Sequence, residues 1–339
     1  MKARFAAIVG GLLLCSLLRA QQPPPVIIDT DCGSDDLMAI AFLLGRKDVR
    51  IEAIVVDNGL AHVRAGTSNI LRLLELGEHG EVPVFVGSET PMRGKRAFPD
   101  SWRETSDTLF RDLKMPYSRH VPQMLPAADY LASRLSDHSR PVRILALGPL
   151  TNFGEALQKS PEILKGVEMV IMGGAIRVPG NLGDGGEFKT DNRKAEWNLF
   201  VDPYAASLVF ASGALIRLVP LDATNRVPIN SEFLGDLRST APTHLGQFVT
   251  GILDRERSLI DQGASYAWDP LAAVALVEPT VAVMTPLAIE VKQKPPEDGR
   301  TAEIKGGRPN ASVALDAVPA VFRKAFLAAL GGNPNSVLR

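Results

Sequence analysis

The chain has 339 residues, of which 45% are hydrophobic and 22% are charged, and its formal net charge is −1. This composition is typical of a globular protein and excludes a disordered or fibrous chain. Basic residues are scattered without a stripe that could follow phosphates, so we expect no nucleic-acid partner.

The first twenty residues differ from the rest of the chain. Lys2 and Arg4 precede an apolar stretch from Phe5 to Leu18, and a polar, proline-rich segment follows at 21–25. This pattern predicts a secretory signal peptide over residues 1–20, which is too short to span a bilayer. We therefore expect a single domain over 21–339, exported to the periplasm or the extracellular space, with no membrane contact once the signal is removed.

Short apolar runs alternate with longer segments of helical period through the rest of the chain. The runs that predict strands are 26–28, 51–56, 84–86, 142–146, 167–171 and 216–219, and the segments that predict helices are 35–44, 61–76 and 150–157. This alternation indicates an α/β fold with an open, largely parallel (mixed) sheet and flanking helices. Because ligands bind beyond the carboxyl ends of the strands in such sheets, we expect the functional site at that edge.

Four carboxylates follow the first predicted strand within eight residues, in the segment Asp29-Thr30-Asp31-Cys32-Gly33-Ser34-Asp35-Asp36. Burying several carboxylates together costs many kcal/mol unless a cation or protons neutralise them. Carboxylate and carbonyl oxygens favour calcium or magnesium over zinc. A helix cap with a solvated acidic face is the alternative, but a cap needs fewer acids. We therefore expect a hard divalent cation here.

This acidic segment resembles the opening signature of the inosine-uridine nucleoside N-ribohydrolases. Four further segments match the family in the same order, at 58–63, 145–152, 172–175 and 268–271. The resemblance implies a Rossmann-like nucleoside hydrolase fold, a bound Ca²⁺ ion and a homodimer or homotetramer. It also implies hydrolysis of the N-glycosidic bond of ribonucleosides, which gives ribose and the free base.

The resemblance assigns roles to individual residues. Asp35 would be the general base that activates a calcium-bound water for attack at C1′, and Asp29 would orient its neighbours. The implied calcium ligands are Asp31, Asp36, Asp269 and the main-chain carbonyl of Leu147. The implied substrate contacts are Asp29, Asn58, Met172, Asn181, Glu196, Trp197 and Asn198. Asn181 departs most from the family spacing, because extra residues separate it from the Glu-Trp-Asn triplet at 196–198.

The chain departs from many members of the family next to the last metal aspartate. Those members place there a histidine that protonates the leaving base, whereas this chain has Trp268, and none of its five histidines stands at that position. The purine-preferring branch of the family uses a tryptophan at this point and a second one from a loop, where this chain has Trp102. Two indoles would stack on a purine, more strongly as its ring gains positive charge. We therefore expect purine nucleosides as substrates.

Two alternatives remain at this stage. A haloacid-dehalogenase-like phosphatase would use Asp29 and Asp31 as nucleophile and acid/base, but it prefers Thr or Val where Gly33 stands. An exported nucleoside-binding protein without catalysis would need no general base, so the presence of Asp35 argues against it.

Overall fold

The structure is a computed structural model that describes residues 23–184, 188–240 and 243–331. The predicted signal peptide at 1–20 lies outside the described residues. Within the described ranges, no helix is both long enough and apolar enough to cross a bilayer.

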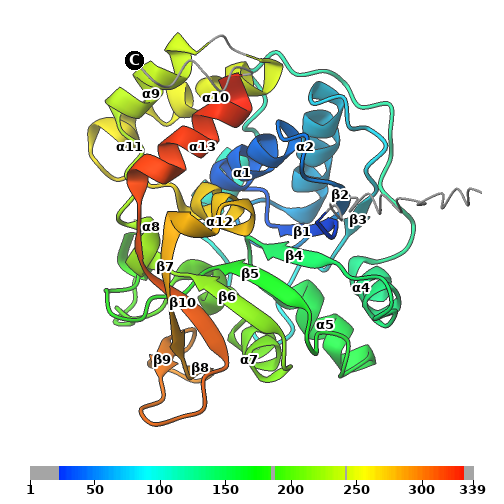
Figure 1. Cartoon of the computed structure of the whole chain (residues 1–339), viewed down its shortest axis with the longest axis vertical. Helices are drawn as coiled ribbons and strands as arrows, with labels where there is room; N and C mark the ends of the chain where they lie inside the picture. The colour runs from blue at the N-terminus through cyan, green and yellow to red at the C-terminus, as the bar shows by residue number, and fades with distance from the viewer. Residues whose placement is uncertain (1–22, 185–187, 241–242, 332–339) are drawn as a thin grey trace, which may run out of the picture.

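The central element is an eight-stranded sheet in the order β3-β2-β1-β4-β5-β6-β10-β7 (Figure 1). Neighbouring strands are parallel except for the β10–β7 pair, which is antiparallel. This confirms the predicted α/β fold with a largely parallel, mixed sheet. The strands are β1 (Val26–Thr30), β2 (Ile51–Val56), β3 (Val84–Val86), β4 (Arg143–Ala146), β5 (Glu168–Met172), β6 (Leu215–Val219), β7 (Ala282–Leu287) and β10 (Ala311–Ala317), with β8 (Ile289–Val291) and β9 (Thr301–Glu303) as a separate pair.

Helices cover both faces of the sheet (Figure 1). The larger apolar core packs beneath α1 (Ser34–Leu44), α2 (Val63–Leu76), α9 (Ser231–Ser239), α10 (His244–Arg255), α12 (Trp268–Val277) and α13 (Pro319–Gly331). A second core lies on the opposite face, beneath α4 (Ala127–Leu135), α5 (Thr151–Lys159) and α7 (Pro203–Ala211). The short helices are α3 (Asp100–Asp107), α6 (Trp197–Val201), α8 (Leu221–Thr224) and α11 (Arg257–Asp261), with single turns at η1 (Leu182–Asp184) and η2 (Pro279–Val281).

Sequence pattern explains where two of these helices lie. Every residue of α1 from Asp36 to Leu44 is buried, as its apolar sequence demands, whereas α2 is amphipathic and exposes one face. Along β1 the side chains alternate between the two cores, so that Ile27 belongs to the α5 side and Ile28 to the α1 side.

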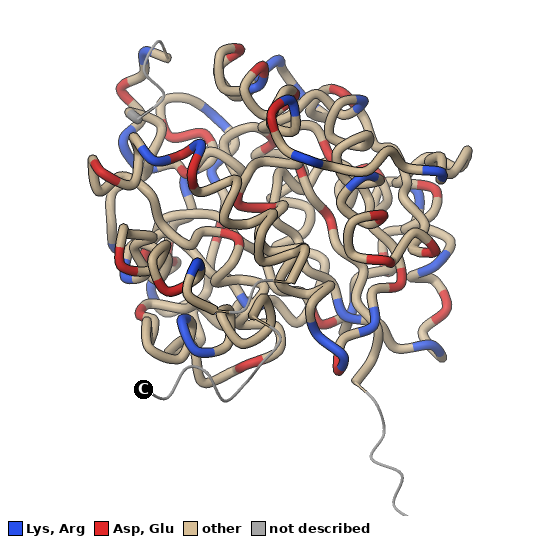
Figure 2. Tube along the Cα trace, turned by 90° about the horizontal axis from the view of Figure 1, so that it is seen from above, with Lys and Arg blue, Asp and Glu red and all other residues tan. Residues whose placement is uncertain are grey.

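The strand order reverses between β1 and β4. From β1 the sheet grows in one direction through β2 and β3, and then in the other through β4, β5 and β6. Such a reversal opens a crevice at the carboxyl ends of the two central strands, where ligands of α/β proteins bind. Along the chain trace in Figure 2, positions of Lys and Arg are interspersed with positions of Asp and Glu.

Candidate active site

The turn from β1 into α1 is held by the Asp36 carboxylate. One of its oxygens accepts hydrogen bonds from the Thr30 hydroxyl (2.6 Å) and the Asp31 main-chain N–H (3.2 Å), and the other accepts from the Gly33 N–H (2.9 Å). A carboxylate at this position satisfies free N–H groups at the start of a helix and interacts favourably with the helix dipole. The turn therefore places Asp31, Asp35 and Asp36 at the mouth of the crevice.

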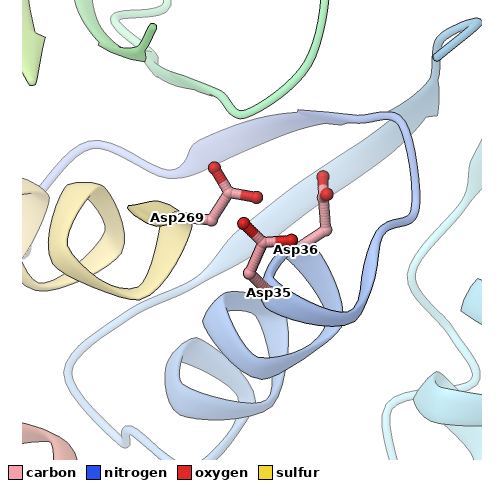
Figure 3. Close-up of side chains that lie close together, drawn as sticks. All are labelled: Asp35, Asp36 and Asp269. Carbon is pink, nitrogen blue, oxygen red and sulfur yellow. The ribbon is translucent and has the colours of Figure 1, made fainter. Parts of the chain in front are cut away.

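Asp269 joins this turn from a distant part of the chain. It lies in the first turn of α12, which packs against α1. Asp35, Asp36 and Asp269 each offer an oxygen within 4.8 Å of the others. Figure 3 shows the three side chains close together, two from α1 and one from α12. Asp31 contacts the same group through Asp36. The structure thus brings together all three carboxylates predicted to ligate calcium, together with the predicted base.

The electrostatics of this cluster favour a bound cation or bound protons. Burial, followed by the charge of Asp36, raises the pKa of Asp31 and of Asp35. Burial and then the neighbouring Asp35 and Asp36 raise the pKa of Asp269. Among the described residues, Asp269 Oδ1 and Asp29 Oδ2 are buried without a hydrogen-bond partner. Unpaired carboxylate oxygens of this kind suit a hard cation, so the donor set fits a divalent ion.

Two glycines allow the main chain to approach Asp31 from both sides. A Cβ at Gly59 would lie 2.0 Å from Asp31 Oδ2, and one at Gly148 would lie 2.8 Å from Asp31 Cβ. The Leu60 N–H donates to Asp31 Oδ2 at 2.8 Å. The carbonyl of Leu147, the fourth predicted metal ligand, accepts a hydrogen bond from Asn198 Nδ2 at 2.6 Å. These glycines are therefore required by the close packing around the cluster.

Asp29 and Asn58 belong to a buried polar network along the same edge of the sheet. Asp29 Oδ1 accepts from Asn152 Nδ2 at 2.8 Å. Asp57 Oδ1 accepts from the Asn58 N–H (2.8 Å) and side-chain amide (3.0 Å), and its Oδ2 accepts from the Asn152 N–H at 3.3 Å. The Asn58 amide also donates to the Thr151 hydroxyl at 3.0 Å. Asp57 therefore orients both asparagines, a role that sequence reasoning missed.

The Glu-Trp-Asn triplet begins α6 on the other side of the crevice. The Glu196 carboxylate accepts from the N–H groups of Asn198 (2.8 Å) and Gly174 (2.9 Å), and burial raises its pKa. The Asn198 amide lies 3.5 Å from the Met172 carbonyl and from its sulfur. The Asn198 amide thus lies between Met172 and the Leu147 carbonyl.

Asn181 also reaches this group, despite its unusual spacing. Gly180 and Asn181 donate main-chain hydrogen bonds to the carbonyls of Arg193 (2.8 Å) and Ala195 (3.2 Å). Asn181 Oδ1 accepts from the Trp197 N–H at 3.1 Å. These hydrogen bonds hold Gly180 and Asn181 beside Arg193 and Ala195, so Asn181 contacts the triplet despite the extra residues between them.

The three tryptophans occupy two separate aromatic groups. We define the aromatic cluster as Phe98, Trp102, Phe188, Trp197 and Phe200. Trp197 is only 3% exposed and lies at its centre, with ring centroids 5.1 Å from Phe98 and 5.6 Å from Trp102. Trp268 instead pairs with Tyr266 at 5.9 Å. Trp102 and Trp268 therefore come from different elements, α3 and α12.

Glu256 is a second residue that sequence reasoning missed. It lies between α10 and α11, hydrogen-bonds with Ser34, and its charge contributes to raising the pKa of Asp35. Burial raises the pKa of Glu256 itself. Its sequence context gave no signal, because it stands in a run of charged residues typical of a solvated helix face.

Comparisons with known proteins agree with this geometry. The family model described as inosine-uridine preferring nucleoside hydrolase matches residues 26–324. The chain is 33% identical to a probable uridine nucleosidase 1 from Oryza sativa subsp. japonica over 260 residues, 75% of this chain and 76% of that protein. It is 28% identical to the pyrimidine-specific ribonucleoside hydrolase RihA of Salmonella enteritidis PT4 over 306 residues, 86% of this chain and 93% of that protein.

A solved structure shows the same architecture. The purine-preferring ribonucleoside hydrolase from Gardnerella vaginalis superposes with a TM-score of 0.80 at 26% identity, covering 91% of this chain and 98% of that one. The family match extends from the first strand of the sheet into the last helix. With its acidic cluster at the β1–β4 crevice, the chain belongs to the inosine-uridine preferring nucleoside hydrolases, enzymes that act on the N-glycosyl bonds of nucleosides.

Proposed function

We propose that this nucleoside hydrolase uses Ca²⁺ to cleave purine ribonucleosides in preference to pyrimidine ones, releasing ribose and the free base. The observation that carries the proposal is the cluster of Asp35, Asp36 and Asp269, whose oxygens lie within 4.8 Å of one another. These carboxylates are buried or half-buried, and the pKa values of Asp35 and Asp269 are raised by burial, so a cation among them would stabilise the charged form.

Each carboxylate then has a distinct task. Calcium bound by Asp31, Asp36, Asp269 and the Leu147 carbonyl would supply positive charge that orders water and the sugar hydroxyls. Asp35, the remaining acid of the cluster, removes a proton from the water that attacks C1′. Attack proceeds through a state with oxocarbenium character, which the surrounding anions stabilise.

The sugar contacts follow from the two sides of the crevice. Asn58 is oriented by Asp57 on one side, and Asn198 lies beside the Leu147 carbonyl on the other. Asn181, Glu196 and Met172 complete the proposed ribose site. Glu196 acts by fixing the start of α6 through its main-chain hydrogen bonds, which orient the adjacent Asn198.

The purine preference rests on the tryptophans. Trp268 immediately precedes Asp269 in the sequence, and its ring pairs with that of Tyr266. Trp102 lies on α3, and its ring contacts that of Trp197. We propose that the purine stacks between these two aromatic groups. Each favourable ring pair contributes about 0.5–1.5 kcal/mol, and more as the leaving base becomes protonated. The relatives include both pyrimidine-specific and purine-preferring hydrolases, so specificity has to be measured directly.

The test is release of reducing sugar from inosine, adenosine, guanosine, uridine and cytidine, with and without a calcium chelator. We expect purines to be cleaved faster than pyrimidines, and the chelator to abolish the release until calcium is added back. Faster cleavage of uridine would reject the stacking argument. Tight nucleoside binding without ribose release would instead identify a binding protein.

We also propose that the protein is exported. The pattern of Lys2, Arg4 and the apolar stretch to Leu18 supports a cleaved leader. N-terminal sequencing of the protein from its native host would show a start near residue 21, whereas an intact Met1 would reject export.

A further inference from the structure

Cleavage of an N-glycosidic bond needs a proton for the leaving base as well as an activated water. Trp268 stands where many relatives carry a histidine, and an indole N–H is not an acid that can transfer a proton in this pH range. The structure offers another histidine near the crevice. The inference that follows rests on the proposed function and names its proton donor.

His62 begins α2, directly after the turn that follows β2. Its ring Nδ1 lies 2.7 Å from Asp107 Oδ2, and its main-chain N–H donates to Asp107 Oδ1 at 2.8 Å. A carboxylate on Nδ1 fixes the tautomer and the orientation of an imidazole, and directs its Nε2 away from the acid. The His62 side chain is 45% exposed.

The turn that carries His62 is part of the candidate site. The Leu60 N–H binds the Asp31 carboxylate at 2.8 Å, and the Ala61 N–H binds the Asp31 carbonyl at 2.9 Å. The Leu60 side chain lies over Gly33, where a Cβ would come within 2.6 Å of its Cδ2. His62 is therefore two residues from a direct contact with the acidic cluster.

His62 is also tied to the aromatic side of the site. Asp107 is the last residue of α3, and the same helix carries Trp102. Leu60 packs against the aromatic cluster that contains Trp102 and Trp197. His62 is thus joined through Asp107 to the helix that carries Trp102, and the turn before it contacts both the acidic cluster and the aromatic cluster through Leu60.

Two acidic side chains bind the start of α2. Asp107 contacts the His62 ring from α3, and Glu89 caps α2 beside it through the N–H groups of Val63 (3.1 Å) and Arg64 (3.3 Å). The Arg64 side chain is exposed on α2.

We propose that His62, oriented by Asp107, donates the proton to the departing purine. The C1′–N9 bond breaks with its electron pair going to the base, and a ring nitrogen of the base takes the proton from His62 Nε2. The water oxygen bonds to C1′ and its proton passes to Asp35. After product release, solvent takes the proton from Asp35 and returns one to His62.

The experiment compares two substrates in the calcium-loaded protein. Inosine needs protonation of its base, whereas p-nitrophenyl riboside releases an anion that leaves without a proton. In His62→Gln, kcat for inosine should fall by about 100-fold or more, while kcat for p-nitrophenyl riboside should stay within about threefold of wild type. Glutamine keeps a side-chain hydrogen bond to Asp107, and the main-chain bond is unaffected, so the fold of the turn is preserved.

Three further variants decide the interpretation. His79→Gln, at an exposed histidine beyond the other end of α2, is the matched control and should leave both substrates unchanged. Asp107→Asn should lower kcat for inosine more than for p-nitrophenyl riboside with little change in KM, as expected for a positioning residue. Asp35→Asn should lose activity toward both substrates, because the hydrolysis of each needs an activated water.

The outcomes separate this inference from the proposed function. If wild type cleaves no nucleoside, the proposed function fails. If wild type cleaves inosine and His62→Gln cleaves it equally well, only the role of His62 is rejected. If Glu256→Gln shows the selective loss instead, the proton comes from the α10–α11 junction and the role of His62 is likewise rejected.

Discussion

The acidic turn at 29–36 and the aromatic cluster serve the same crevice but are built in different ways. The acidic turn is one contiguous segment whose geometry is set by its own hydrogen bonds, such as Thr30 to Asp36 at 2.6 Å. The aromatic cluster collects rings from α3, from Phe188 and from α6, and Trp197 in its centre is 3% exposed. Most of the carboxylate cluster is thus encoded in one segment, to which α12 adds Asp269, while the proposed contacts with the base depend entirely on long-range packing.

The strongest way to break this comparison is to remove the proposed base. Asp35→Asn should lower kcat by about 10²–10⁴-fold, because proton removal by a positioned group contributes that much. Calcium binding measured by calorimetry should remain, since Asp31, Asp36, Asp269 and the Leu147 carbonyl are intact. Loss of calcium binding together with activity would make Asp35 a ligand and merge the two roles.

Trp197, at the centre of the aromatic cluster, should contribute mainly to the stability of the fold. Trp197→Ala removes a buried indole that contacts several rings, so the free energy of unfolding should fall by about 3–5 kcal/mol. Trp197→Phe keeps most of the packing and should cost less than about 1.5 kcal/mol. Urea denaturation measures both, and equal stability for the alanine variant would show that the cluster is not packed as described.

Removing calcium should make stability depend on pH in a defined direction. Burial raises the pKa of Asp31, Asp35 and Asp269 in the folded chain, so the native state binds protons that the unfolded state has lost. Stability of the chelated protein should therefore fall as the pH rises above about 4, the ordinary value for aspartate. Thermal unfolding at several pH values measures this dependence.

Calcium should oppose that loss of stability. At free calcium about 100 times its Kd, binding to the native state contributes about 2.7 kcal/mol. The gain should be largest at the pH where the chelated protein is weakest, and magnesium serves as the comparison ion. A melting temperature that changes with neither calcium nor pH would show that the carboxylates are neutralised in another way.

The smallest expected effect is a change in the preference between inosine and uridine. Trp268→Ala should lower kcat/KM for inosine by about 2- to 13-fold relative to uridine, since one stacking contact contributes about 0.5–1.5 kcal/mol. Leu271→Ala, deeper in α12, is a control for helix stability, and it should lower kcat/KM for inosine and for uridine by the same factor. A variant that loses uridine and inosine to the same extent would remove the base-stacking role of Trp268.

The sequence predicted the parts of this molecule that depend on neighbouring residues. The strand at 26–28 and the helix at 35–44 correspond to β1 and α1, because an apolar run followed by a capped helix is a local pattern. Asp36 and Asp269 could be paired only through the family resemblance, since no local rule links them. The structure brings them together by packing α12 against α1.

Other features could not be predicted from local pattern. Asp57 reads as an ordinary loop residue after a strand, and its role appears only when Asn152 is brought to it from α5. The pairing of His62 with Asp107 depends on how α3 docks beside α2. The spacing of Asn181 matched the family pattern only weakly, yet its hydrogen bonds with Ala195 and Trp197 place it against the triplet. Tertiary contacts decide all three.

Cys32 lies inside the acidic turn, where it can report on the motion of that turn. Cys32 is fully buried, adopts a positive φ of 62° and packs against Gly66, where a Cβ would lie 2.8 Å from its sulfur. In a protein produced from residue 21 onward it is the sole thiol, because Cys15 is then absent. The rate at which an aromatic disulfide reagent labels Cys32 would therefore report how often the acidic turn opens, with no engineered probe.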